Sequence, residues 1–169
     1  FPVAGYEENR YRLFECRMGL DTFQLQAERA KLHATLLVHV PVDDPMEVWE
    51  VTLTNRGAAD SPILSDILPL DLAFELSAKE RAYLHYAKGS RGEIDDFLPQ
   101  TATLGPKSAM TLAPIGGRSS NGVLPFMNLH HRDGGIMLAV GWSGQWQATF
   151  ARDGESLRVT AGMQTTRLR

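Results

Sequence analysis

Two pairs of adjacent aspartates are the first candidates for catalytic chemistry. Asp43–Asp44 precede Pro45, and Asp95–Asp96 precede Phe97 in the segment RGEIDDFLPQ. Paired carboxyl groups that cleave a bond must converge on it, about 5–5.5 Å apart in one common geometry. Adjacent residues of an extended chain point to opposite sides, so neither pair supplies both groups alone. We expect a turn at Asp43–Asp44. Asp95–Asp96 and Phe97 are predicted either to contact a ligand or another domain, or to form hydrogen bonds within their loop.

The other reactive side chains do not form a recognisable metal or nucleophile site. His33 and His39 are six residues apart, about 20 Å along one strand, and His130–His131 point to opposite faces. The single cysteine, Cys16, allows neither an internal disulfide nor a cysteine-based zinc site, and we expect a packed thiol. Ser119–Ser120 lack the G-x-S-x-G elbow. We therefore predict no metal, no cofactor and no catalytic residue in this chain.

One arginine and two tryptophans are candidates for binding. Arg118 lies in GGRSSNG, which no predicted helix follows, so a phosphate-cradling loop is disfavoured. We expect its guanidinium to clamp a carboxylate of this chain or of a neighbouring domain. Trp142 and Trp146 flank a Ser-Gly turn in GWSGQWQ. Such rings either stack on sugars or pack the core where two strands turn, and we expect core packing for both.

Composition limits the class of protein. The chain has 169 residues, of which 43% are hydrophobic and 22% are charged, and its formal charge is −3. These values fit one globular domain with a sizeable core. The basic residues are scattered, so we expect no nucleic-acid partner, and no apolar run is long enough to indicate a membrane partner. Because the chain begins with Phe1 and ends in TTRLR, we expect a processed protein or a piece of a longer one, and its compartment is not predicted.

The elements that must position these residues are β-strands, because the dominant period of the apolar residues is two. Alternation of apolar and polar residues is found in the segments 22–28, 33–40, 48–54, 146–150 and 156–163. Turn signals such as Arg-Asp-Gly at 152–154 separate the runs at intervals of about ten residues, which favours a sandwich or barrel. The apolar segment 135–142 is predicted to be a central strand covered on both faces. Segment 75–88 favours a strand with an irregular approach over a helix.

Two segments rich in glycine, proline and charge, 91–100 and 115–126, interrupt the strand pattern. Long loops on a rigid β scaffold often carry binding residues, so functional residues are expected there.

The order of four segments is informative: IDDFLP, GGRSSNGVLPF, GGIMLAVGWSGQW and the terminal AGMQTTRLR. Together they resemble the amino-terminal domain of melibiase-type α-galactosidases, glycoside hydrolase family 36 and its relatives.

The resemblance covers roughly residues 49–169 and includes WEVTLTNRGAADSPILSDILPLDL. The family shows a Gly-Arg-Ser-Ser stretch, then Pro-Phe, then a strand ending in a Ser-Gly turn with an aromatic residue. Here these are Gly117–Ser120, Pro125–Phe126 and Ser143–Trp146. The segment Asn121–Leu124 departs from the family's usual linker, which puts the substrate in doubt.

The resemblance implies an all-β fold, an antiparallel two-sheet β-supersandwich formed by residues 1–169 as a single domain. A catalytic (β/α)8 barrel would follow in the parent chain and would carry the nucleophile and the acid/base. The implied function is to pack on that barrel and shape its sugar pocket. The implied partners are the barrel, a galactoside substrate and further copies in a homo-oligomer. The contact candidates are Asp95, Asp96, Phe97, Arg118, Trp142 and Trp146. Two alternatives remain open: a self-standing carbohydrate-binding module that uses its tryptophans, and a purely structural sandwich.

Overall fold

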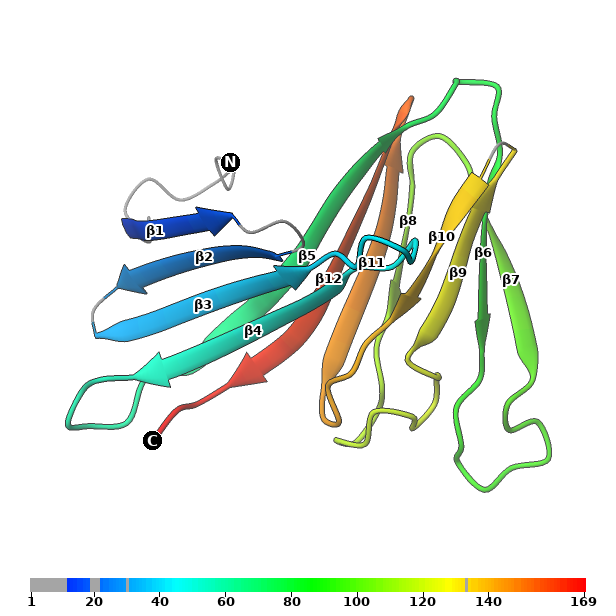
Figure 1. The fold of residues 1–169 in the computed structure, drawn as a ribbon. Helices are drawn as coiled ribbons and strands as arrows, with labels where there is room; N and C mark the ends of the chain where they lie inside the picture. Colours follow the sequence, from blue (N-terminus) through cyan, green and yellow to red (C-terminus); the bar gives the residue numbers. More distant parts are fainter. Residues whose placement is uncertain (1–11, 19–21, 30, 133) are drawn as a thin grey trace. The chain divides into compact units, whose positions relative to one another are not determined.

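The computed structural model describes residues 12–169 except 19–21, 30 and 133, with side chains described from residue 31 onward. The described chain contains twelve strands and no helix, in three antiparallel four-stranded sheets (Figure 1). No described segment is therefore a helix of the length and hydropathy that crossing a membrane requires. The all-β antiparallel fold predicted from the period-two pattern is confirmed.

The strands fall into two compact units. The N-terminal unit, residues 1–64 with 166–169, holds the sheet β1-β2-β3-β4. The C-terminal unit, residues 65–165, holds the sheets β10-β9-β6-β7 and β5-β12-β11-β8. The strands are β1 Arg12–Met18, β2 Thr22–Arg29, β3 Leu32–His39, β4 Val48–Asn55, β5 Leu64–Glu75, β6 Ala82–Ala87, β7 Pro99–Leu104, β8 Ser108–Leu112, β9 Phe126–His131, β10 Gly134–Ala139, β11 Trp146–Asp153 and β12 Ser156–Thr166.

The core of the C-terminal unit follows directly from alternation. On β11, Trp146, Ala148 and Phe150 are fully buried, while the residues between them are partly exposed. The other large, fully buried side chains of the unit are Leu84, Leu104, Leu157 and Val159. Burial of one large apolar side chain contributes about 1.5–3 kcal/mol, so these buried side chains account for much of the stability of the unit.

Two strand predictions have opposite outcomes. The segment 75–88 does contain a strand, β6, preceded by a turn at residues 76–81, as predicted. The prediction of a central strand at 135–142 was wrong, because β10 ends at Ala139 and lies at the edge of its sheet, beside β9 alone. Its apolar run does not reflect burial on both faces, since Met137 is 87% exposed.

A buried arginine joins the turns at one end of the C-terminal unit. Arg152, on β11, is only 2% exposed. Its Nη1 donates to the carbonyl oxygens of Glu80 at 2.6 Å and Leu104 at 3.2 Å. Its Nη2 donates to the carbonyl of Ser77 at 3.1 Å, and its Nε donates to that of Gly154 at 3.0 Å. All four hydrogen bonds are accepted by main-chain carbonyls, so the guanidinium holds three separate turns together.

Candidate functional site

Three loops meet at one end of the C-terminal unit, drawn at the bottom of Figure 1. They join β6 to β7, β8 to β9 and β10 to β11, and they comprise residues 88–98, 113–125 and 140–145. We call this surface the loop end. It contains both segments that the sequence singled out and the Ser-Gly turn between the two tryptophans.

The second and third loops are bonded to each other. The amide of Gly117 donates to Oε1 of Gln145 at 2.9 Å, and the amide of Ser119 donates to the carbonyl of Ser143 at 3.2 Å. Trp146 donates from Nε1 to the carbonyl of Ser119 at 2.7 Å. The indole N–H of a buried tryptophan needs such a partner, so the core residue also anchors the loop above it.

The first loop is bonded to the second. The amide of Ser90 donates to the carbonyl of Ser120 at 2.8 Å, and the amide of Leu124 donates to the carbonyl of Ala87 at 3.0 Å. Gly89 permits this approach, because a Cβ at that position would stand 1.9 Å from the Ser120 carbonyl oxygen. Only a residue without a side chain fits at that distance. The three loops therefore form one connected surface.

Asp96 is used inside its own loop. Its carboxylate accepts hydrogen bonds from the amides of Arg91 at 2.8 Å and Gly92 at 2.9 Å, and from the hydroxyl of Ser90 at 3.2 Å. The Arg91 amide is the largest of the influences that lower the pKa of Asp96 below its ordinary value of 3.8, and partial desolvation acts against them. Of the two roles predicted for Asp96, hydrogen bonding within the loop is the one observed.

The depressed pKa predicts a pH-dependent loop. A carboxyl group whose pKa is lower in the folded chain adds stability above its ordinary pKa of 3.8, and this stability is lost as the pH falls through the lowered value. We expect the amide proton signals of Arg91 and Gly92 to shift with a midpoint below 3.8 in an NMR titration. In Asp96→Asn the pH-dependent shifts of both amide signals should disappear. A midpoint at or above 3.8 would contradict the bonded carboxylate.

The other acidic and basic candidates lie nearer to solvent. Asp95 forms an ion pair with Lys88, which closes the same loop, and both side chains are partly exposed. The Arg118 side chain is exposed, and within the described ranges it has no hydrogen bond or ion pair. The carboxylate clamp expected of Arg118 is thus not formed inside the described part of this chain.

The two tryptophans differ. Trp146 is fully buried, which confirms the predicted core packing. For Trp142 that prediction was wrong, because its side chain is 45% exposed. Trp142 follows the end of the edge strand β10, and its ring lies against Gly144, where a Cβ would stand 2.9 Å from the indole Nε1.

The loop end carries exposed apolar side chains. Phe97 is 56% exposed and has a φ of 63°, a left-handed conformation that is uncommon for an aromatic residue. The other exposed large apolar residues of these loops are Ile94, Leu98, Ile115 and Trp142. The sequence points to the loops, and the segment IDDFLP contains Ile94 and Leu98, but neither these residues nor Ile115 are predicted as contact residues.

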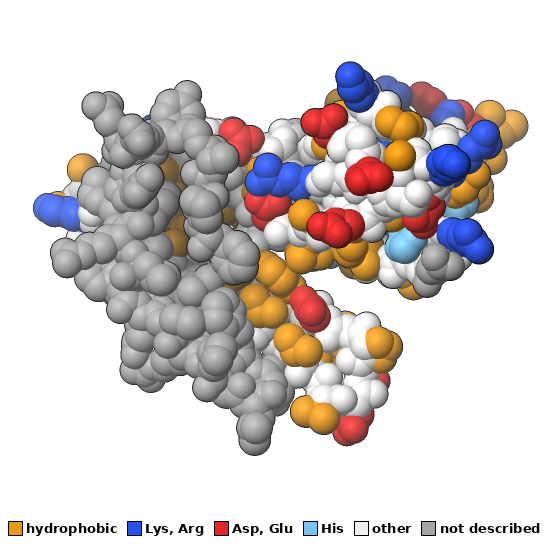
Figure 2. All heavy atoms as spheres, turned by 90° about the horizontal axis from the view of Figure 1, so that it is seen from above, with side chains coloured by type: hydrophobic (Ala, Val, Ile, Leu, Met, Phe, Trp, Pro, Cys, Tyr) orange, Lys and Arg blue, Asp and Glu red, His pale blue; other side chains and the backbone are white. Residues whose placement is uncertain are grey.

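The opposite end of the same unit has a different character. It consists of the turns at 76–81, 105–107 and 154–155 and of the strand ends beside them. Its described charged residues are Lys79, Glu80, Arg81, Lys107, Arg132, Asp153 and Glu155. Figure 2, which views the molecule from above, shows charged side chains of both signs spread over this end. A charged, mixed surface is typical of contact with solvent, whereas grouped apolar side chains indicate a contact surface.

Comparison with known proteins identifies the class of fold. Residues 2–64 match the family model of the glycosyl hydrolase 94 supersandwich domain. The chain is also similar to the crystal structure of the GH36 α-galactosidase AgaA from Geobacillus stearothermophilus, with 17% identity and a TM-score of 0.67 over 95% of this chain. A variant of that enzyme in complex with 1-deoxygalactonojirimycin gives 16% identity and a TM-score of 0.68 over 95% of this chain, and a second variant with stachyose gives 16% and 0.67 over 95%. No curated protein sequence matches.

The chain therefore has the β-supersandwich fold found in glycoside hydrolases. The matching family model is that of family 94, whereas the similar solved structures belong to family 36, and at 16–17% identity their likeness concerns the fold. The chain spans a quarter of the length of each of the three solved structures.

Proposed function

We propose that this chain is the non-catalytic N-terminal β-supersandwich domain of an α-galactosidase-like glycoside hydrolase, with residues 1–169 as one domain. In this proposal the loop end packs against a catalytic (β/α)8 barrel of the same parent chain and shapes the rim of its sugar pocket. The observation that carries the proposal is the set of exposed apolar side chains on three loops that hydrogen bonds hold together.

Three further observations support the proposal. Phe97 holds an aromatic ring in solvent with a left-handed backbone, an arrangement that costs free energy and is typical of contact sites. The two candidate carboxylates are engaged by Lys88 and by the loop itself, so they do not converge as a catalytic pair. Arg118 extends from the same surface without a partner among the described residues, as an arginine that clamps a carboxylate of another domain would.

The experiment is to replace Phe97 and Trp142 with serine in the protein at its natural length. We expect the rate of proteolysis between the domains to rise about tenfold, because the loss of apolar area at a domain contact shifts the equilibrium toward the open form. The KM for an α-galactoside should also rise if these loops form the pocket rim. Arg118→Ala should act in the same direction. Val42→Ser is the matched control, since Val42 is 82% exposed in the N-terminal unit. Unchanged proteolysis and kinetics in both loop variants would overturn the proposal.

One observation favours a second candidate function, a carbohydrate-binding module, because Trp142 is exposed. Titration with galactosides distinguishes the two. A module would show saturable quenching of tryptophan fluorescence that is lost in Trp142→Phe, whereas a domain contact would leave the emission of the intact protein unchanged.

A further inference from the structure

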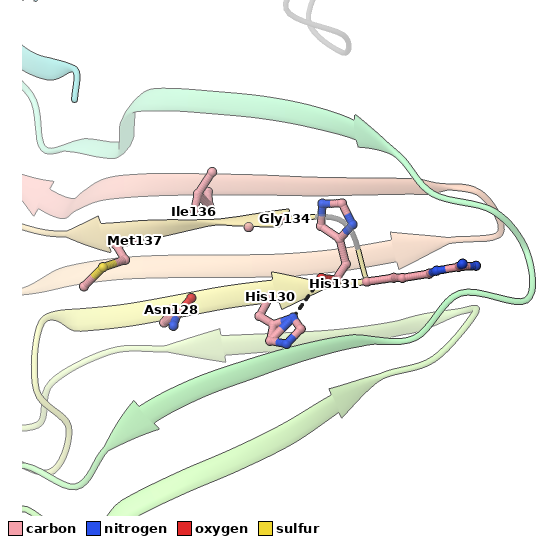
Figure 3. Close-up of a pocket in the computed structure, with 8 residues that line it drawn as sticks. Asn128, His130, His131, Gly134, Ile136 and Met137 are labelled. Atoms are coloured by element: carbon pink, nitrogen blue, oxygen red, sulfur yellow. Dashed lines mark hydrogen bonds between the residues drawn. The ribbon is translucent and has the colours of Figure 1, made fainter. Parts of the chain in front are cut away.

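A shallow hollow of about 390 Å³ lies over the β9–β10 hairpin, away from the loop end (Figure 3). Its cause is a pair of glycines. In the strand register Gly135 faces His130 and Gly134 faces His131, so two bulky rings stand opposite bare backbone. A Cβ at Gly135 would stand 2.2 Å from the carbonyl oxygen of Leu129, so a larger residue does not fit without displacing the hairpin. The hollow is thus a built feature of the hairpin.

The side chains along the outer face of this sheet form a row. Phe126, Asn128 and His130 alternate with the buried Met127 and Leu129 on β9. Phe126 is 62% exposed. Residues two apart on a strand are about 7 Å apart, so the row places a ring, an amide and an imidazole along roughly 14 Å of one strand.

Neighbouring strands extend this row sideways. Met137 of β10 faces Asn128 in the register and is 87% exposed. On β6, Tyr83 contacts the His130 ring edge-on at 6.0 Å between centroids, and the His85 ring lies 6.2 Å from it. Figure 3 shows Asn128 and His130 on one side of the hairpin and His131 and Ile136 on the other. The rings of Tyr83 and His85 therefore lie on one side of the His130 imidazole, and the hollow lies on its other side.

Hydrogen bonding fixes what His130 presents outward. Its Nδ1 lies 2.8 Å from the carbonyl oxygen of His131, and a carbonyl can only accept, so Nδ1 carries the proton. In the neutral ring Nε2 is then a hydrogen-bond acceptor, and it has no partner in the described part of the chain. The amide of Asn128, which offers both a donor and an acceptor, likewise has no protein partner there.

The row itself contains no carboxylate, lysine or arginine side chain, and Phe126, Asn128 and Met137 are uncharged. Arg132, which follows β9, lines the hollow beside the row. The nearby Glu80 carboxylate is engaged elsewhere, since it is hydrogen-bonded to His131 at 2.8 Å on the other side of the hairpin. A ligand that matches an exposed aromatic ring together with free neutral donors and acceptors is itself neutral, rich in hydroxyl groups, and apolar on one face.

We propose that the outer face of the β9–β10 hairpin, formed by Phe126, Asn128, His130 and Met137, is a binding site for a neutral saccharide. The Phe126 ring stacks on the C–H face of one sugar unit, because the negative face of an aromatic ring attracts positively polarised edges. Asn128 and His130 Nε2 bond the hydroxyls of the next unit. This site lies outside the loop end and performs no chemistry, so it goes beyond the proposed function and does not depend on it.

The experiment follows the Met137 methyl signal in protein of natural length that carries ¹³C-methyl methionine. The signal is assigned with Met137→Leu, and stachyose is added to millimolar concentration. We expect a saturable shift at Met137, while the buried Met127 does not shift and reports an intact fold. A catalytic pocket elsewhere in the protein does not move the Met137 signal.

Variants test which side chains bind. Asn128→Ala with His130→Ala should raise the Kd about tenfold or more, since both hydrogen-bonding groups are lost. Phe126→Ala should have a similar effect. His39→Ala, which removes an exposed histidine of the N-terminal unit, should leave the Kd unchanged. The proposal is overturned if stachyose and a neutral glucan oligosaccharide both leave Met137 unshifted, or if only an acidic oligosaccharide shifts it.

Discussion

Replacing Arg152 with methionine is expected to lower the free energy of unfolding by about 3 kcal/mol, because the main-chain carbonyls that its guanidinium bonds lose their donor. Methionine has a similar length and keeps the apolar contacts of the stem, so the loss isolates the guanidinium. The carbonyls of Ser77, Glu80 and Leu104 would lose their donor inside the unit. A buried acceptor without a partner costs about 1–3 kcal/mol. The bond to Leu104 is buried and those to Ser77 and Glu80 are partly buried, so together they account for the expected effect.

Urea unfolding followed by circular dichroism measures this difference. The matched control is Arg158→Met, because Arg158 is paired with Asp71 in a two-point ion pair at the surface, with its side chain 55% exposed. A surface pair of this kind contributes about 0–1 kcal/mol, so the control should change little. Equal losses in the two variants would show that the burial of Arg152 has no special role.

The second large effect is expected at Trp146. Trp146→Ala should lower the free energy of unfolding by about 3–5 kcal/mol, since it leaves a cavity at a fully buried position of β11. Trp146→Phe keeps most of the apolar volume but leaves the Ser119 carbonyl without its indole donor, and about 2 kcal/mol should be lost. This variant should also broaden the amide signals of the loop at 113–125, because its anchor is gone.

Trp142→Ala is the comparison for Trp146. Its side chain is 45% exposed and rests on Gly144, so its loss should cost about 0.5 kcal/mol. Both differences can be measured by the same urea titration. If Trp142→Ala destabilised the chain as strongly as Trp146→Ala, the distinction between an anchored core residue and an exposed loop residue would be wrong.

The strand content of this chain could be predicted because it rests on alternation, which is a local property. Trp146, Ala148 and Phe150 are buried as their spacing indicates. The environment of β10 could not be predicted, because whether an apolar strand is central or at an edge depends on which partner pairs with it. The same reason explains Trp142, whose exposure follows from the edge position of the preceding strand.

The candidate site could be predicted only in part, because its residues are local in sequence but many of their bonding partners are not. Asp96 could be assigned to a loop, but its bonds to Arg91 and Gly92 depend on the course of the backbone. The sequence marks Arg152 only as part of an Arg-Asp-Gly turn signal, because three of its carbonyl partners are 48 to 75 residues away in sequence. The sequence places Phe126 and Met137 in two separate segments of the resemblance but does not predict the outer-face row, since Met137 meets Asn128 only through strand pairing.

The bonding of the loop end has a consequence for how this surface can diversify. Ser119 to Ser143, Ser90 to Ser120 and Leu124 to Ala87 are joined by main-chain amides and carbonyls alone. Every residue type except proline offers both groups, so the loops keep their shape when their side chains are exchanged. Randomised libraries at Ile94, Phe97, Ile115, Arg118 and Trp142 should thus retain the framework while altering what it recognises. A single exchange at Gly89 or Trp146 would disturb the whole frame. The surface thus combines a main-chain framework that stays constant with side chains that can vary.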